Sequence, residues 1–243
     1  MAGHSKWANI KHRKGRADAA KGKVFTRITK EIITAVKLGG PDLKSNSRLR
    51  LVLQKARAAN MPSDNIERNI KKASSADQAA YSEMTYELYG HGGVGMILDI
   101  MTDNKNRISS DVRIALNKKG GNLANPGAVA YNFDQKGVIQ VLKANALEDA
   151  LFGAVTEAGA DDFETEDEMF IITTPPDQLF RVKEAIDHLG IKCETAELQM
   201  LPKVYVECSP EDQKANLELI EWIEGLDDVD AVHHNMRMDL VQS

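Results

Sequence analysis

Residues 137–174 read GVIQVLKANALEDALFGAVTEAGADDFETEDEMFIITT, and this stretch decides the fold. Apolar residues run together over 137–142, recur three and four apart over 146–158, and return in two short segments at 162–165 and 169–174. A second helical pattern over 176–189 and a last strand over 191–198 follow. The resulting order, β-α-β-β-α-β, is that of the split βαβ or ferredoxin-like motif.

The segments on either side of this motif belong together. Before it, we expect strands at 84–89 and 94–101, a helix that buries Ile108, Val112, Ala115 and Leu116, and a strand at 128–133. After it, we expect a strand at 203–208, a helix capped near Ser209 and a final strand at about 230–238. The sequence therefore predicts an α/β domain of residues 76–133 plus 203–243, with an acidic ferredoxin-like domain of residues 134–202 inserted in it.

Within residues 1–75, the first twenty show no clean period and predict an arm, and the remainder shows helical patterns only. Between Ala17 and Leu38 the apolar residues recur at a spacing of three and four, and Gly39-Gly40-Pro41 is a typical helix end. Ser47 can cap a second helix and Pro62 suits the first turn of a third. The fold class is thus α+β: an N-terminal three-helix basic bundle followed by two α/β domains, the third ferredoxin-like and inserted in the second.

Charge divides the chain sharply. The whole protein has 31 basic and 36 acidic side chains, a formal net charge of −5 and a pI of about 5.7. Residues 1–72 alone hold 18 Lys and Arg against 5 Asp and Glu, which leaves 13 basic and 31 acidic residues for the remainder. Such asymmetry is typical of a protein that binds a polyanion at one end. A merely solvated basic bundle is the other interpretation.

The candidate nucleic-acid-binding residues fall into two groups. A glycine-containing arm carries the first group, and the second lies opposite the apolar face of the first helix, where we expect a basic stripe turned outward. Trp7 either anchors the packing of the arm or stacks on a base. The residues are Lys6, Trp7, Lys11, Arg13, Lys14 and Arg16 in the arm, and Lys23, Arg27 and Lys30 in the stripe.

Signals for catalysis or a cofactor are weak. Gly90, Gly92 and Gly95 satisfy G-x-G-x-x-G, but strand-forming residues follow them where a dinucleotide site needs a helix, so they predict a hairpin turn. His233 and His234 are adjacent on a strand and point to opposite faces. The acidic run 161–168 either is solvated or binds a metal or a basic protein. We therefore expect no enzyme, no cofactor and no metal.

The chain shows no features of a membrane or disulfide-bonded protein. No apolar run approaches the ~20 residues that span a bilayer. Two cysteines without a pairing motif suit a reducing cytosol. We expect a cytoplasmic protein, although the basic start also has the composition of a mitochondrial transit peptide.

Five stretches resemble the YebC/PmpR family along essentially the whole chain. They are MAGHSKWANIKHRK at the start, YGHGGVG at 89–95, TDNKNR at 102–107, KKGGNL at 118–123 and FDQKG at 133–137. His91 stands where the commonest form of the glycine turn has proline. The resemblance implies a helical N-terminal domain, two α/β domains with the third inserted in the second, a cytoplasmic location and no known catalytic site.

The same resemblance implies two roles that charge cannot separate. Some members of the family look like promoter-binding transcriptional regulators, while others act on the ribosome and ease translation through proline-rich stretches. We expect a DNA-binding transcriptional regulatory protein. The alternative is a translation factor bound to ribosomal RNA, because duplex DNA and ribosomal RNA are both dense arrays of phosphate.

Overall fold

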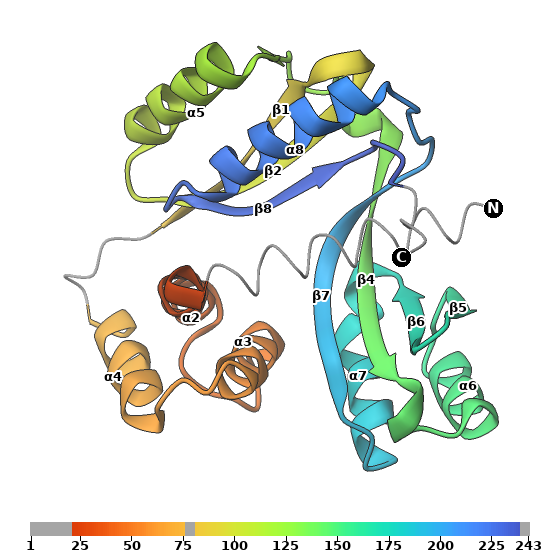
Figure 1. Ribbon diagram of the computed structural model, residues 1–243. Helices are drawn as coiled ribbons and strands as arrows, with labels where there is room; N and C mark the ends of the chain where they lie inside the picture. The colour runs from red at the N-terminus through yellow and green to blue at the C-terminus, as the bar shows by residue number, and fades with distance from the viewer. Residues whose placement is uncertain (1–20, 76–80, 239–243) are drawn as a thin grey trace. The chain divides into compact units, whose positions relative to one another are not determined.

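The structure is a computed structural model that describes residues 21–75 and 81–238, with side chains from residue 24 onward. The chain divides into two units. One consists of Phe133–Lys203, and the other contains residues 21–132 together with Val204–Arg237. Figure 1 shows the helices and strands of both units, which are described separately below.

A three-helix bundle begins the larger unit, with α2 at Lys21–Gly39, α3 at Ser47–Ala58 and α4 at Ser63–Ala73. Its core is built from the apolar residues that set the helical period, among them Ile28, Ile32, Leu49, Leu53 and Ile66. These side chains are all less than a tenth exposed. The periodic spacing of the sequence thus places the bundle core correctly.

Asn46, and not Ser47, is the residue that caps α3. Its side-chain oxygen accepts a hydrogen bond from the backbone N–H of Leu49 at 2.9 Å. Its amide nitrogen donates to the carbonyl oxygens of Ala35 and Gly40, each at 2.8 Å. One buried side chain therefore satisfies both the end of α2 and the start of α3.

The rest of the larger unit is a sheet with two helices. The strand order in the sheet is β3-β1-β2-β8. Helices α5 and α8 pack against each other on one side of this sheet (Figure 1). The elements are β1 (Ser82–Tyr89), β2 (Gly95–Thr102), α5 (Lys105–Lys119), β3 (Asn122–Leu123), α8 (Pro210–Glu224) and β8 (Val229–His234). Strands β1 and β2 form the expected hairpin, in which Tyr89 pairs with Gly95 across the glycine turn.

The smaller unit has the expected β-α-β-β-α-β order. Its strands lie in the order β5-β6-β4-β7 and all neighbouring strands are antiparallel, which is the ferredoxin-like arrangement. The elements are β4 (Phe133–Leu142), α6 (Glu148–Glu157), β5 (Asp162–Thr165), β6 (Met169–Thr174), α7 (Leu179–His188) and β7 (Cys193–Pro202). Together with the bundle, this confirms the α+β fold class.

Two predicted strands are wrong. Residues 128–133 form a turn and a short 3-10 helix, Ala130–Asn132, before β4 begins at Phe133. Residues 203–208 form no strand, and only Val206 makes an isolated bridge, to Met236. Residues 128–133 form no strand because a side chain on β1 accepts hydrogen bonds from backbone N–H groups of this loop. Those N–H groups are then not available to pair with another strand.

That side chain is the carboxylate of Glu87, which is 9% exposed on β1. One oxygen accepts the N–H of Gly127 at 2.6 Å, and the other accepts those of Val129 at 2.6 Å and Ala130 at 2.8 Å. Burial alone would raise the pKa of Glu87, but these three bonds to the charged form outweigh it and lower the pKa. The Glu87 carboxylate thus holds loop residues 127–130 in place through three hydrogen bonds.

The substitution Glu87→Gln tests how much these three hydrogen bonds stabilise the protein. Glutamine replaces one acceptor oxygen by a donor, so at least one buried N–H loses its partner, and we expect a loss of about 2–3 kcal/mol in the free energy of unfolding by urea. Glu83→Gln on the same strand removes an exposed ion pair with Arg48 and should cost less than about 1 kcal/mol. Equal losses of unfolding free energy in the two variants would contradict the stabilising role of the Glu87 hydrogen bonds.

The pH dependence of unfolding free energy in the wild type and in Glu87→Gln gives a second measurement. Because the folded pKa of Glu87 is depressed, its stabilising effect is present above the unfolded value of about 4.3 and is lost as the pH falls through the folded value. The difference in stability between the wild type and Glu87→Gln should therefore narrow as the pH drops below about 4.

Candidate nucleic-acid interface

Most of the predicted nucleic-acid-binding residues fall outside the described part of the chain. Residues 1–20 contain Lys6, Trp7, Lys11, Arg13, Lys14 and Arg16, and these remain predictions. Lys23 lies on α2, but its side chain is also outside the description. The structure therefore places two of the candidate side chains, Arg27 and Lys30.

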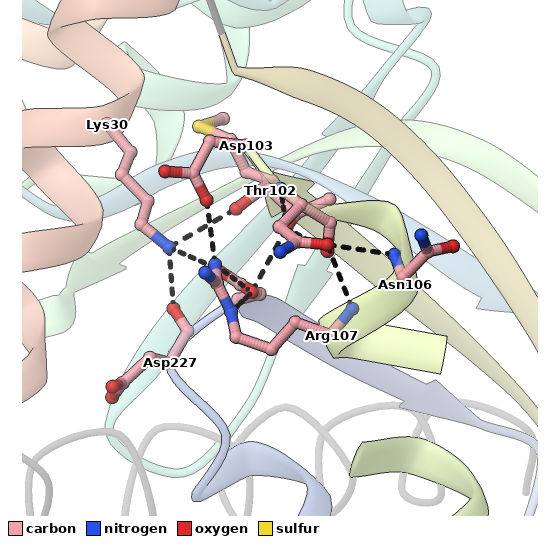
Figure 2. A network of polar contacts seen from close by, with 9 residues as sticks. Lys30, Thr102, Asp103, Asn106, Arg107 and Asp227 are labelled. Atoms are coloured by element: carbon pink, nitrogen blue, oxygen red, sulfur yellow. Dashed lines mark hydrogen bonds and ion pairs between the residues drawn. The ribbon is translucent and has the colours of Figure 1, made fainter. Parts of the chain in front are cut away.

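Lys30 does not face solvent as the sequence predicted. Its side chain is buried, with 8% of the residue exposed, and its ammonium group reaches Asp228 Oδ1 at 2.8 Å. It also donates to the carbonyl oxygens of Asp227 at 2.9 Å and Met101 at 3.3 Å (Figure 2). The prediction that Lys30 is part of an outward stripe is wrong.

The reason is that α2 has packing partners on two sides. Every residue from Lys30 to Val36 is buried. One side meets α3 and α4, while the other meets the end of β2, where the Thr34 hydroxyl lies 3.5 Å from Met101 Sδ. Arg27, one turn before Lys30, is half-buried and donates to the carbonyl oxygen of Glu224 at 3.0 Å.

Asp228 is the centre of this network. Besides Lys30, its carboxylate accepts the Thr102 hydroxyl at 3.0 Å and the guanidinium of Arg107 at 2.9 and 2.6 Å. Figure 2 shows Arg107 and Lys30 approaching from different elements, α5 and α2. Burial would raise the pKa of Asp228, but the hydrogen bonds from Lys30 and Arg107 outweigh burial, so its pKa lies below the ordinary value.

Two further cations of the bundle are held by carboxylates. Arg48 pairs with Glu83, and Lys55 pairs with Glu31 at 2.8 Å. Glu31 is only 9% exposed, and burial raises its pKa although Lys55 opposes the shift. Both cations remain partly exposed, but their charge is compensated by these carboxylates.

Other basic side chains of the bundle are exposed and have no carboxylate partner among the described residues. Most of them lie in the last turn of their helix, where the helix dipole also favours a cation. They are Lys37 on α2, Lys44 before α3, Arg57 on α3, and Arg68, Lys71 and Lys72 on α4. None of them is among the binding residues predicted from the sequence, although their signal was present: basic residues close several helices with few acids within reach.

The glycine turn offers no phosphate site of the dinucleotide type. His91 in this turn contacts the carbonyl oxygen of Lys119 through Nε2 at 2.8 Å. The side chain of Asn216 accepts the His91 N–H at 2.8 Å and donates to the His91 carbonyl at 3.0 Å. The next element is β2, so the hairpin prediction is confirmed.

The described residues hold no metal-binding group and no membrane-spanning helix. Across residues 24–75 and 81–238, no three His, Cys, Asp or Glu side chains come together as metal ligands. Within the same part of the chain, every helix is too short or too polar to cross a bilayer.

Comparison with known proteins identifies the family. The family model described as the TACO1/YebC N-terminal domain matches residues 5–76, and the one described as the TACO1/YebC second and third domain matches residues 81–236. The chain belongs to the TACO1/YebC family. The boundary between the two matches falls at the junction between the bundle and β1.

Close relatives of this TACO1/YebC chain are named as regulators. A probable transcriptional regulatory protein of Protochlamydia amoebophila is 70% identical over 238 residues, which cover 98% of this chain and 97% of the relative. One from Chlamydia pneumoniae is 56% identical over 97% of this chain and all of its own length. These names support a regulatory role and describe no enzyme.

A solved structure supports the fold. The crystal structure of a conserved hypothetical protein from Aquifex aeolicus matches with a TM-score of 0.82 and 38% identity. The match covers 93% of this chain and 95% of that one.

The buried network gives a test of the position of Lys30. Removing one partner of a buried ion pair leaves the other uncompensated, so Lys30→Met should lower the free energy of unfolding by about 3 kcal/mol. Lys37→Met, an exposed lysine on the same helix, should change it by less than about 0.5 kcal/mol. Urea unfolding measures both, and equal effects would mean that Lys30 is not buried.

Proposed function

We propose that this chain is a nucleic-acid-binding regulator of gene expression whose basic N-terminal region binds the phosphate backbone of DNA. The observation that carries this is a set of exposed bundle cations without a carboxylate partner among the described residues, of which Arg57, Lys71 and Lys72 are three. Clustered Lys and Arg bind phosphates largely irrespective of base sequence, by releasing counterions.

The contributing residues differ from those predicted from the sequence in two respects, because the exposed bundle cations are added and Lys30 is removed. The arm residues Lys6, Lys11, Arg13, Lys14 and Arg16, with Trp7, remain part of the proposal, as do Lys23 and Arg27. Lys30 is left out because its ammonium group is bound to Asp228. Arg27 is kept because its hydrogen bond to the Glu224 carbonyl oxygen uses one terminal nitrogen of a group with five N–H donors.

The acidic inserted domain supports an N-terminal location for binding. In the turn between β5 and β6, the exposed residues Asp167 and Glu168 carry negative charge that repels phosphate. The regulatory names of the relatives agree with DNA as the target.

The alternative is a translation factor bound to ribosomal RNA. One observation favours it: the same acidic turn that repels phosphate suits contact with basic ribosomal proteins. Affinity for duplex DNA and for a folded ribosomal RNA fragment, measured side by side at several salt concentrations, separates the two. Tighter binding to the RNA at every salt concentration would replace DNA as the target.

Two charge-reversal variants of the full-length protein test whether the exposed cations of the bundle bind nucleic acid. The variant Arg57→Glu/Lys71→Glu/Lys72→Glu should weaken binding by at least about 100-fold and reduce the salt slope of log affinity by about 3. The matched control reverses Arg113, Lys105 and Lys118, which are exposed on α5. It changes net charge equally and should weaken binding only a few-fold, because it adds only long-range repulsion.

Equal losses in the two variants would show that net charge, and not this surface, governs binding. Circular dichroism melts of both variants check that the bundle is still folded, since all six side chains are exposed.

A further inference from the structure

The end of α2 and the loop that joins it to α3 expose apolar side chains at one end of the bundle. Leu38 is 70% exposed and Leu43 is 41% exposed, and Pro41 between them is exposed as well. None of the three belongs to the core cluster of the bundle. We call these three residues the apolar tip. Single exposed leucines are ordinary on protein surfaces, so the surroundings of the tip decide whether it has a use.

Hydrogen bonds hold the loop in one shape. The Arg50 guanidinium donates to the carbonyl oxygens of Leu43 at 2.7 Å and Lys44 at 2.9 Å. The Asn46 side chain donates to the carbonyl oxygen of Gly40, and Gly40 has a φ of +78°, a conformation that favours glycine and turns the chain out of α2. A side chain presented by such a loop enters a ligand with little loss of conformational entropy.

The acid of this loop, Asp42, is bound by donors of the loop itself. Its Oδ1 accepts the backbone N–H of Lys44 at 3.0 Å, and its Oδ2 accepts the Ser45 hydroxyl at 3.2 Å. Residues 38–46 contain no other acid. The carboxylate therefore does not compensate the charges of Lys37 and Lys44, the two exposed lysines that flank the tip in the sequence.

A second helix brings further cations to the same end of the bundle. The Lys37 ammonium group donates to the carbonyl oxygen of Ser75 at 2.9 Å, so the end of α4 lies beside the end of α2. The last turn of α4 carries Lys71 and Lys72, both exposed. This end of the bundle thus combines a rigid apolar tip with lysines from α2, the loop and α4.

We propose that Leu38 and Leu43 insert between adjacent base pairs of duplex DNA and bend it. This inference rests on the proposed function and adds to it the way in which the duplex is held. The stacked faces of the bases are apolar and lie between two rows of phosphates, so an apolar wedge flanked by cations matches both. Wedges of this kind enter from the minor groove, unstack one base step and kink the duplex by about 20–90°.

An anionic bilayer is the other surface that accepts an apolar tip between lysines, and the observations favour DNA. Two leucine side chains bury less apolar surface than a myristoyl chain, which by itself binds a membrane only marginally. One or two apolar side chains are enough to part a base step. Insertion also gives the chain a preference for DNA that bends easily, without any contact to base edges.

Energy transfer between dyes at the two ends of a duplex of about 30 base pairs measures the bend. The full-length wild type should raise the transfer. The variant Leu38→Ser/Leu43→Ser keeps every cation, so it should still bind, at most about tenfold more weakly, and leave the duplex straight. The matched control, Leu123→Ser/Leu147→Ser, removes two leucines that are 48% and 79% exposed elsewhere and should bend the duplex like the wild type.

A duplex with a two-nucleotide bulge gives a second measurement. Stacking is already interrupted at the bulge, so the wild type should bind this duplex about tenfold more tightly than the fully paired one, and the Leu38→Ser/Leu43→Ser variant should lose that preference. Circular dichroism melts check that the variant is folded, and Leu38→Ser alone replaces it if it is not.

The possible results separate the wedge from the proposed function. Equal bending by the wild type and the leucine variant, or a bulge preference that the variant retains, would overturn the wedge and leave phosphate binding in place. Failure of the wild type to bind either duplex would overturn both. Sedimentation with phosphatidylserine vesicles that the leucine variant loses, together with unchanged bending, would assign the leucines to a lipid surface and also overturn the wedge.

Discussion

A buried lysine and a buried aspartate, Lys30 and Asp228, join α2 to a turn 198 residues later in the chain. Removing each charge from water costs several kcal/mol, which is offset only when the remaining hydrogen-bonding capacity is filled. Here both carboxylate oxygens of Asp228 are used, because Thr102 and Arg107 complete what Lys30 begins. All partners are satisfied only when the bundle and the β1–β2–β8 sheet meet in one orientation, so the pair selects that orientation.

This requirement changes how positive charge is distributed over the bundle. Lys30 holds the bundle to the sheet, and Lys55 compensates a buried glutamate, Glu31. The charge that remains for a ligand is on helix ends such as Arg57 and Lys71. A lysine that bridges two domains and a lysine that contacts phosphate look alike in sequence, since both interrupt an apolar pattern at helical spacing. Only the partner across the interface distinguishes them.

Features that depend on one segment's own period could be predicted from the sequence, whereas features that depend on a partner far away in the chain could not. The order of elements within Phe133–Lys203 was predictable, because its strands and helices follow their own periods, although β4 begins four residues earlier and β7 ends four residues later than the apolar runs predict. The position of Lys30 was not, because a helical period reveals one packing partner and α2 has two. The strand expected at 128–133 failed for a related reason. Its alternation of Val129, Tyr131 and Phe133 is real, but the carboxylate of Glu87 binds the N–H groups of the loop, and that contact comes from 42 residues away.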